Sequence, residues 1–204
     1  SSFGTCAYEK EYNSGFGSNG LTSARHDVLN KYYAEQYPET FESTLEGDVV
    51  YIGKHRMTDR LSVGGKDISI GKLLLSPTRT FAPVLKTLLE ENFEAIHGLI
   101  HCSGGGQTKC LKYIPEQVRV VKDDLFTPPV IFDIIQQASG ASAHEMYQVF
   151  NMGCRMEIYS TERHAASVIQ AANHYGVEAR IIGRVEAAER KELVIQTKDE
   201  ALKF

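Results

Sequence analysis

The alternation of apolar and polar positions is clearest between residues 95 and 102, near the middle of the chain. Ile96, Gly98, Ile100 and Cys102 fall on one face of an extended segment, and the residues between them fall on the other. This period of two predicts a strand. A polar run with three consecutive glycines, residues 103–106, follows it directly. The rest of the predicted fold is organised around this strand and its loop.

Apolar residues recur at helical spacing, every three or four positions, in several other segments. The first helix is predicted to begin at Leu21 and to continue through Tyr32, with its pattern fading before Pro38. Ser142 and Glu145 have the spacing of a capping box, which begins a helix that Gly153 ends. The other helices are predicted for residues 78–91, 108–111, 128–138 (from Pro128 or Pro129) and 161–175.

Shorter apolar runs predict strands at residues 48–52, 118–122, 155–160, 179–185 and 192–197, the last two as a closing antiparallel pair. Residues 1–20 have the composition of a loop. Residues 39–72 are interpreted as an exposed, charged loop, with a lid as the alternative, and residues 198–204 as a frayed tail. Together these elements predict an α+β fold, a mixed β-sheet covered by helices.

Length, composition and charge exclude several classes of protein. A chain of 204 residues with 42% hydrophobic content suits one large domain or two small ones, and we interpret residues 1–204 as a single domain. A net charge of −4 argues against nucleic-acid binding. There is no secretory signal and no apolar run near the roughly 20 residues of a membrane span. Four cysteines without a C-x-x-C spacing indicate a cytoplasmic protein. The chain begins at Ser1 rather than Met, which suggests a piece of a longer protein.

Two glycine-rich stretches are candidate anion sites. The first glycine loop (residues 15–20) precedes the predicted helix at Leu21, and the second glycine loop (residues 103–106) follows the central strand. Glycines let backbone N–H groups approach a ligand, and a helix N-terminus favours negative charge. Each loop has a plainer interpretation: a helix cap at Ser18 or Asn19 for the first, and a tight turn for the second. If both bind one anion, they lie close together at one edge of the sheet.

Few side chains offer catalytic chemistry. His97 and His101 lie about 13 Å apart along a strand, too far to share a metal ion, and we expect no metal site. His101 could transfer a proton or donate to a substrate, or it could be a structural histidine. Arg79 stands at the start of the helix predicted for residues 78–91, where a cation opposes the helix dipole, so it has either a tertiary role or a plain surface position. Cys102 has no neighbouring cations in the sequence, so we do not expect a nucleophile there.

Four motifs in fixed order carry a family resemblance. They are Ser18-Asn19-Gly20, Ser76-Pro77-Thr78-Arg79, His101-Cys102-Ser103-Gly104-Gly105-Gly106 and Glu145-Met146-Tyr147-Gln148-Val149-Phe150-Asn151-Met152-Gly153. Nearly the whole chain resembles the C-terminal domain of phosphoribosylformylglycinamidine cyclo-ligase, the aminoimidazole ribonucleotide synthetase of purine biosynthesis. The last motif is the most specific.

The resemblance implies an ATP-dependent enzyme that acts on formylglycinamidine ribonucleotide. ATP activates the formyl oxygen as an iminophosphate, and an internal nitrogen then closes the imidazole ring. The resemblance places ATP and Mg²⁺ mainly in an N-terminal domain that is absent here and that builds a homodimer. It also implies that this domain's first strand is largely missing, with residues 1–4 at its end.

By the same resemblance, the ribose phosphate of the substrate is bound by Ser18, Asn19 and Gly20 together with Ser103, Gly104, Gly105 and Gly106. Arg79 would be a supporting donor, and His101 would be a donor or the catalytic group. The chain departs from the family at Gly17, where the family has His, and at Glu116, where it has Arg. These departures leave two alternatives open: a non-catalytic phosphometabolite-binding module, or a related ATP-dependent enzyme with another substrate. A purely structural protein, without a ligand, is the least favoured of the functional hypotheses.

Overall fold

The computed structural model describes residues 2–6, 12–18, 20–76 and 78–204. Within these residues the strands form two four-stranded sheets and a separate hairpin. The strands are β1 Ser2–Cys6, β2 Arg60–Val63, β3 Lys66–Ser69, β4 Ile96–His101, β5 Val118–Lys122, β6 Met156–Ser160, β7 Val177–Arg180, β8 Gly183–Ala187, β9 Glu192–Gln196 and β10 Ala201–Lys203.

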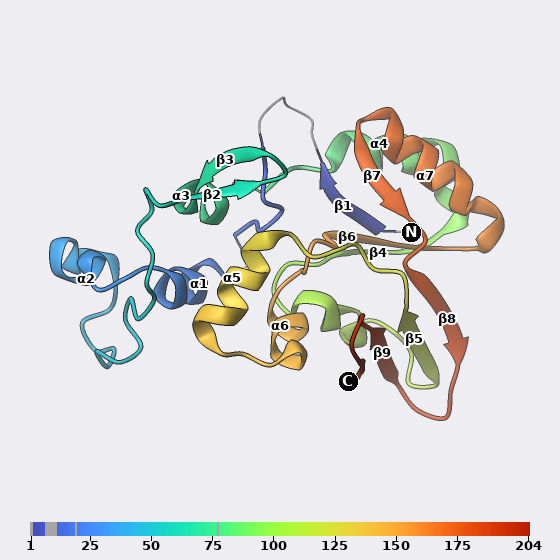
Figure 1. Ribbon diagram of the computed structural model, residues 1–204. Coiled ribbons are helices and arrows are strands. Elements are labelled where there is room, and N and C mark those ends of the chain that lie inside the picture. Colours follow the sequence, from blue (N-terminus) through green and yellow to red (C-terminus); the bar gives the residue numbers. More distant parts are fainter. Residues whose placement is uncertain (1, 7–11, 19, 77) are drawn as a thin grey trace.

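The α-helices are α1 Leu21–Val28, α2 Tyr32–Gln36, α3 Ile70–Leu74, α4 Ala82–Asn92, α5 Val130–Ser139, α6 Ala143–Val149 and α7 Ala165–His174. Short 3₁₀ helices are η1 Pro38–Thr40, η2 Phe93–Ala95, η3 Gly106–Lys112 and η4 Glu162–His164. The predicted α+β class is confirmed, but the strands that were expected in one mixed sheet are divided between two (Figure 1).

The first sheet has the order β4-β6-β1-β7, and all its strands are antiparallel. Helices α4 and α7 lie together over this sheet (Figure 1), where Val84 and Leu88 of α4 and Val168 of α7 pack against Met156 and Ile158 of β6. The expectation that residues 1–20 are a loop is wrong for Ser2–Cys6, which form β1, whereas residues 12–18 contain no helix or strand. β1 lies inside this sheet, between β6 and β7, because both neighbours offer it an unpaired edge.

The second sheet has the order β10-β9-β5-β8 and is mixed, since β5 runs parallel to β9 and antiparallel to β8. The strand predicted for residues 179–185 is in fact two strands in different sheets. The chain crosses between them at Ile182, whose carbonyl oxygen accepts hydrogen bonds from the N–H groups of Asp123 and Asp124. The predicted closing pair is therefore also wrong, because β5 lies between β8 and β9.

The larger core lies between the second sheet and helices α1, α3, α5 and α6. An aromatic cluster of Phe16, Phe132 and Phe150, with ring centroids 5.8 to 6.0 Å apart, joins the first glycine loop to α5 and to the end of α6. The capping box of α6 is confirmed: Ser142 Oγ accepts from the Glu145 N–H, and the Glu145 carboxylate accepts from the Ser142 N–H.

Three predicted helices are shorter than expected. The helix begun by Ser142 ends at Val149 and not at Gly153. The helix from Leu21 ends at Val28 and a second begins at Tyr32, because the Asn30 N–H turns to the His55 carbonyl instead of continuing the helix. The helix predicted for residues 78–91 begins at Ala82, where the Thr80 hydroxyl accepts the Ala82 N–H. Arg79 therefore precedes this helix and is not at its first turn.

The charged region of residues 39–72 is more ordered than predicted. It contains the β2–β3 hairpin, which turns at Gly64-Gly65, and α3. No strand forms at residues 48–52, since Tyr51 has a φ of 48° and the Ile52 N–H bonds to the His26 carbonyl.

The tail of residues 198–204 is not frayed. β10 pairs with β9 because Leu202 has an apolar cluster to enter, and Leu202 is buried there. Within the segment predicted as a helix at residues 161–175, η4 precedes α7.

Candidate functional site

The first glycine loop has a backbone that only glycine adopts easily. Gly17 and Gly20 have φ angles of 72° and 74°. A Cβ atom on Gly20 would lie 2.3 Å from a ring carbon of Phe150, so no side chain fits there. Ser18 is exposed, and its N–H donates to Thr78 Oγ1 at 3.2 Å. Asn19 lies outside the described residues.

The second glycine loop begins at the end of β4 and leads into η3. Gly105 and Gly106 have φ angles of 92° and 49°, and a Cβ atom on Gly106 would lie 2.5 Å from the Phe150 carbonyl oxygen. The ammonium group of Lys109 donates to Ser103 Oγ at 2.7 Å. This loop therefore combines a left-handed backbone, a hydroxyl group and a cation.

Both glycine loops contact one segment, Phe150 and Asn151. Gly20 meets the Phe150 ring and Gly106 meets its backbone. The Asn151 amide donates to the carbonyls of Gly15 (3.3 Å) and Phe16 (3.0 Å). The two loops therefore lie close together, as the sequence predicted, although they are far apart along the chain.

His101 lies on the α4 side of β4, with its ring centroid 6.3 Å from that of Phe81. Burial lowers the pKa of His101 from its ordinary value, and the nearby charges of Arg155 and Lys109 lower it further. The imidazole is therefore neutral near pH 7 and can donate one hydrogen bond and accept another.

Arg155 places a buried guanidinium beside His101 and the first glycine loop. Its Nη2 atom lies 3.7 Å from the point where a Cβ of Gly17 would be, and the guanidinium carbon is 5.7 Å from the Phe81 ring centroid. Arg79, half-buried, lies in the short segment between Thr78 and Phe81. The site thus combines backbone N–H groups, hydroxyls and cations, which is the chemistry of an anion site.

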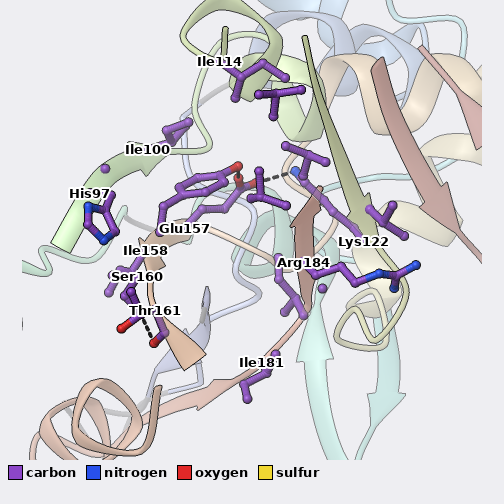
Figure 2. A pocket seen from close by; sticks show the side chains of 18 of the residues that line it. His97, Ile100, Ile114, Lys122, Glu157, Ile158, Ser160, Thr161, Ile181 and Arg184 are labelled. Carbon is purple, nitrogen blue, oxygen red and sulfur yellow. Dashed lines mark hydrogen bonds and ion pairs between the residues drawn. The ribbon is translucent and has the colours of Figure 1, made fainter. Parts of the chain in front are cut away.

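A large cavity lies elsewhere in the molecule. A cleft of about 930 Å³ opens between strands β4 and β6 of the first sheet and strands β5 and β8 of the second. Its walls are mostly aliphatic, and Figure 2 shows Lys122 and Glu157 facing each other in it, with His97 on β4 to one side. Ile100, opposite Glu157 in the register, lines this cleft, whereas His101 lies on the other face of β4. The cleft and the glycine loops are therefore separate features.

Lys122 and Glu157 form an almost fully buried ion pair, with 1% and 3% of their side chains exposed and a distance of 2.5 Å from Nζ to Oε1. Burial opposes the charge on Lys122, but Glu157 outweighs it and raises the pKa of Lys122 above its ordinary value. Burial, and next the charge of Glu157, raise the pKa of the Cys102 thiol well above its usual range. The Cys102 thiol therefore favours its protonated form, and it donates to Glu157 Oε1 at 3.1 Å.

Among the described residues, no three His, Cys, Asp or Glu side chains group in a way that could hold a metal ion. None of the helices in this part of the chain has the length and apolar character to cross a membrane.

Sequence reasoning missed several buried polar residues in the site or next to its glycine loops. Asn151 lies within the motif that carries the resemblance, so its polar side chain in an apolar run was a usable signal. Lys122, Glu157 and Arg155 look like ordinary charges at strand ends, and nothing local shows that they are buried. Gln107, fully buried, follows the second loop without any distinguishing pattern.

Comparison with known proteins gives the following relationships. A family model described as AIR synthase related protein, C-terminal domain, matches residues 10–196. The phosphoribosylformylglycinamidine cyclo-ligase of Methanopyrus kandleri is 33% identical over 174 residues, which cover 85% of this chain and 41% of that protein.

Proteins of the same name show similar relationships in two other organisms. The Methanocaldococcus jannaschii protein is 33% identical over 173 residues (84% of this chain, 42% of that protein). The Syntrophus aciditrophicus protein is 30% identical over 178 residues (86% and 45%). The chain spans less than half the length of these curated relatives.

Proposed function

The chain belongs to the family of AIR synthase related proteins, as their C-terminal domain, and from this we propose that it is the substrate-side domain of a phosphoribosylformylglycinamidine cyclo-ligase. The whole enzyme would convert formylglycinamidine ribonucleotide to aminoimidazole ribonucleotide with ATP. Its substrate is a small ribonucleotide rather than a nucleic acid or a membrane, and the full-length protein would act as a cytoplasmic homodimer.

The meeting of the two glycine loops at Phe150 and Asn151 is the observation that supports this proposal most strongly. A phosphate has oxygens in several directions, so it needs donors from more than one segment. Ser18, Asn19 and Gly20 of one loop, with Ser103, Gly104, Gly105 and Gly106 of the other, would supply N–H groups and hydroxyls.

Cations and a neutral imidazole surround these loops in the proposed site. Lys109, bonded to Ser103, and Arg79 would add positive charge to the phosphate site. His101, kept neutral, would hold or donate a proton at the reacting part of the substrate. ATP and Mg²⁺ would be bound mainly outside these 204 residues, because the sequence has no Walker loop to hold a triphosphate.

Calorimetric titration of the 204-residue chain with formylglycinamidine ribonucleotide tests the proposal. We expect weak but saturable binding, competed by ribose 5-phosphate. Lys109→Met should weaken it about tenfold through loss of a charged donor. Lys112→Met, an exposed lysine on the same 3₁₀ helix, is the matched control and should change nothing. Absence of binding to the wild-type chain at millimolar ribonucleotide would refute the assignment.

An ADP-release assay on the same chain tests the placement of ATP. With Mg²⁺, ATP and ribonucleotide present, the chain alone should release no ADP above the rate without protein. Release that scales with the chain's concentration would show that ATP is bound and cleaved within these residues.

A further inference from the structure

We propose that the buried Lys122–Glu157 ion pair is a clamp that positions both glycine loops, holding the second loop at its two ends and reaching the first through Gln107 and Asn151. This inference rests on the proposed function only in treating the loops as the anion site. Neither Lys122 nor Glu157 would touch the substrate, so both are positioning residues.

Lys122 holds the far end of the second glycine loop. Its ammonium group has three hydrogens, and each has an acceptor: Glu157 Oε1 at 2.5 Å, the Gln107 carbonyl oxygen at 2.7 Å and Gln107 Oε1 at 3.1 Å. Two of these three bonds fix Gln107, the residue directly after Gly106. Lys122 belongs to β5, so the second sheet sets where the loop ends.

Glu157 holds the near end of the same loop. Its Oε1 atom accepts from the Cys102 thiol at 3.1 Å, and Cys102 directly precedes Ser103. Its Oε2 atom accepts from the Tyr159 hydroxyl at 2.7 Å, which fixes the carboxylate. Glu157 belongs to β6, so the first sheet sets where the loop begins, and the ion pair fixes the two ends relative to each other.

Gln107 passes this constraint to the first glycine loop. Its side-chain amide donates to the carbonyls of Asn151 (2.6 Å) and Cys154 (2.9 Å). The Asn151 amide in turn donates to the carbonyls of Gly15 and Phe16. A continuous chain of buried hydrogen bonds therefore runs from Lys122 to both loops.

An ion pair at this position is better explained by positioning than by stability. A buried pair often contributes no more to stability than apolar side chains of similar volume. Its hydrogen bonds are directional, however, and an apolar pair would make no hydrogen bonds to the Cys102 thiol or to Gln107. The expected consequence is that replacing both charges leaves the fold intact and loosens the loops.

Amide hydrogen exchange on the 204-residue chain tests the clamp without any ligand. In the double variant Lys122→Met with Glu157→Met, the melting temperature should change little, while amides of residues 15–18 and 103–106 exchange about tenfold faster or more. The control Arg119→Met with Glu192→Met removes an ion pair from the same strand β5 and should leave both loops unchanged. Loop exchange equal to wild type in the folded double variant would overturn the proposal.

A second variant keeps the proposal testable if the double variant does not fold. Gln107→Met leaves Lys122, Glu157 and the Gln107 main chain in place, with the main-chain acceptor for Lys122. It removes the side-chain amide that bonds to Asn151, Cys154 and Lys122. Exchange should then accelerate mainly in residues 15–18. Acceleration in neither loop would contradict the clamp. Ribonucleotide titration of the wild-type chain separates the two claims, because a chain that binds no ribonucleotide refutes the function and leaves the exchange result to judge the clamp.

Discussion

At the scale of single residues, the second glycine loop places different demands on two adjacent glycines. A Cβ atom on Gly105 would meet Lys109 only at ordinary contact distance, 3.6 Å or more, so the φ of 92° is the obstacle there. At Gly106 a Cβ atom would collide with the Phe150 backbone as well. Gly105 therefore offers a way to perturb the loop with less damage to its packing.

We predict that Gly105→Val abolishes ribonucleotide binding with little loss of secondary structure. A branched side chain at this φ costs about 1–3 kcal/mol and displaces the N–H groups that would face the phosphate. Calorimetry and far-ultraviolet circular dichroism measure the two effects. Gly140→Val is the control, since Gly140 has a φ of 71° with nothing near it, at the end of α5. Unchanged affinity in Gly105→Val would show that the loop is only a turn.

His26 is a residue whose ionisation bears on stability rather than on the site. It is 6% exposed, and its Nδ1 atom accepts the Tyr51 N–H at 3.3 Å, which helps to hold the unusual backbone of Tyr51. Burial, followed by the charge of Arg25, lowers the pKa of His26, while Asp27 opposes the shift. Protonation would replace the acceptor by a donor and break this bond.

Stability should therefore fall when the pH drops below about 6.5, the ordinary histidine pKa. The pKa of His26 is lower in the folded chain than in the unfolded chain, so the unfolded chain binds the proton first as the pH falls. The stabilisation that neutral His26 gives to the fold is therefore complete above about pH 6.5, and it is lost as the pH falls toward the folded-state pKa. Urea unfolding at pH 7.5 and 5.5 measures the difference. In His26→Gln the difference in unfolding free energy between the two pH values should shrink. A difference equal to that of the wild type would show that other groups cause the pH dependence.

At the scale of elements, short sequence patterns correctly predicted those helices and strands whose structure depends on interactions between nearby residues. The capping box at Ser142 and the alternation of β4 both appear as predicted, because their determinants lie within a few residues. The break after Val28 and the crossing at Ile182 depend on hydrogen bonds to distant carbonyl or N–H groups, which no local pattern records. β10 was missed because Leu202 and Phe204 are separated apolar residues in a tail that is otherwise mostly charged, and only the folded cluster gives them partners.

We predict that Leu202→Ala lowers the free energy of unfolding by about 2–4 kcal/mol, the usual cost of a cavity in a core. Lys203→Ala, on the exposed face of the same strand, should change it by less than about 0.5 kcal/mol. Urea unfolding of both variants makes the comparison. Equal, small effects would mean that β10 is frayed after all.

Ser142→Ala should cost about 1 kcal/mol, because it removes the acceptor for the Glu145 N–H at the start of α6. Glu145→Gln keeps a side-chain acceptor for the Ser142 N–H and should cost less. The same unfolding measurement ranks the two variants. The reverse order would show that the carboxylate charge matters more than the serine cap.

At the scale of the whole molecule, the sequence predicted the parts of the site but not what holds them together. Glycine runs are visible in any sequence, and the hypothesis that both bind one anion predicted that they lie close together, as they do at Phe150 and Asn151. The clamp of Lys122, Glu157 and Gln107 joins three separate segments, and each partner looks ordinary in its own context. These three residues differ from ordinary polar residues only in being buried by the fold, and the burial of a charge at a strand end cannot be predicted from its neighbours in the sequence.

The larger core and the smaller cluster around α4 and α7 should unfold as one unit. Both cores share the first sheet as a wall: Ile100 of β4 belongs to the larger cluster, and Ile158 of the adjacent strand β6 belongs to the smaller one. Leu88→Ala in α4, a fully buried position, should therefore cost about 2–5 kcal/mol. It should also raise amide exchange in β9 as much as in α4, because both then exchange through global unfolding. A faster rate confined to α4 and α7 would show that this cluster opens by itself while the glycine loops stay in place.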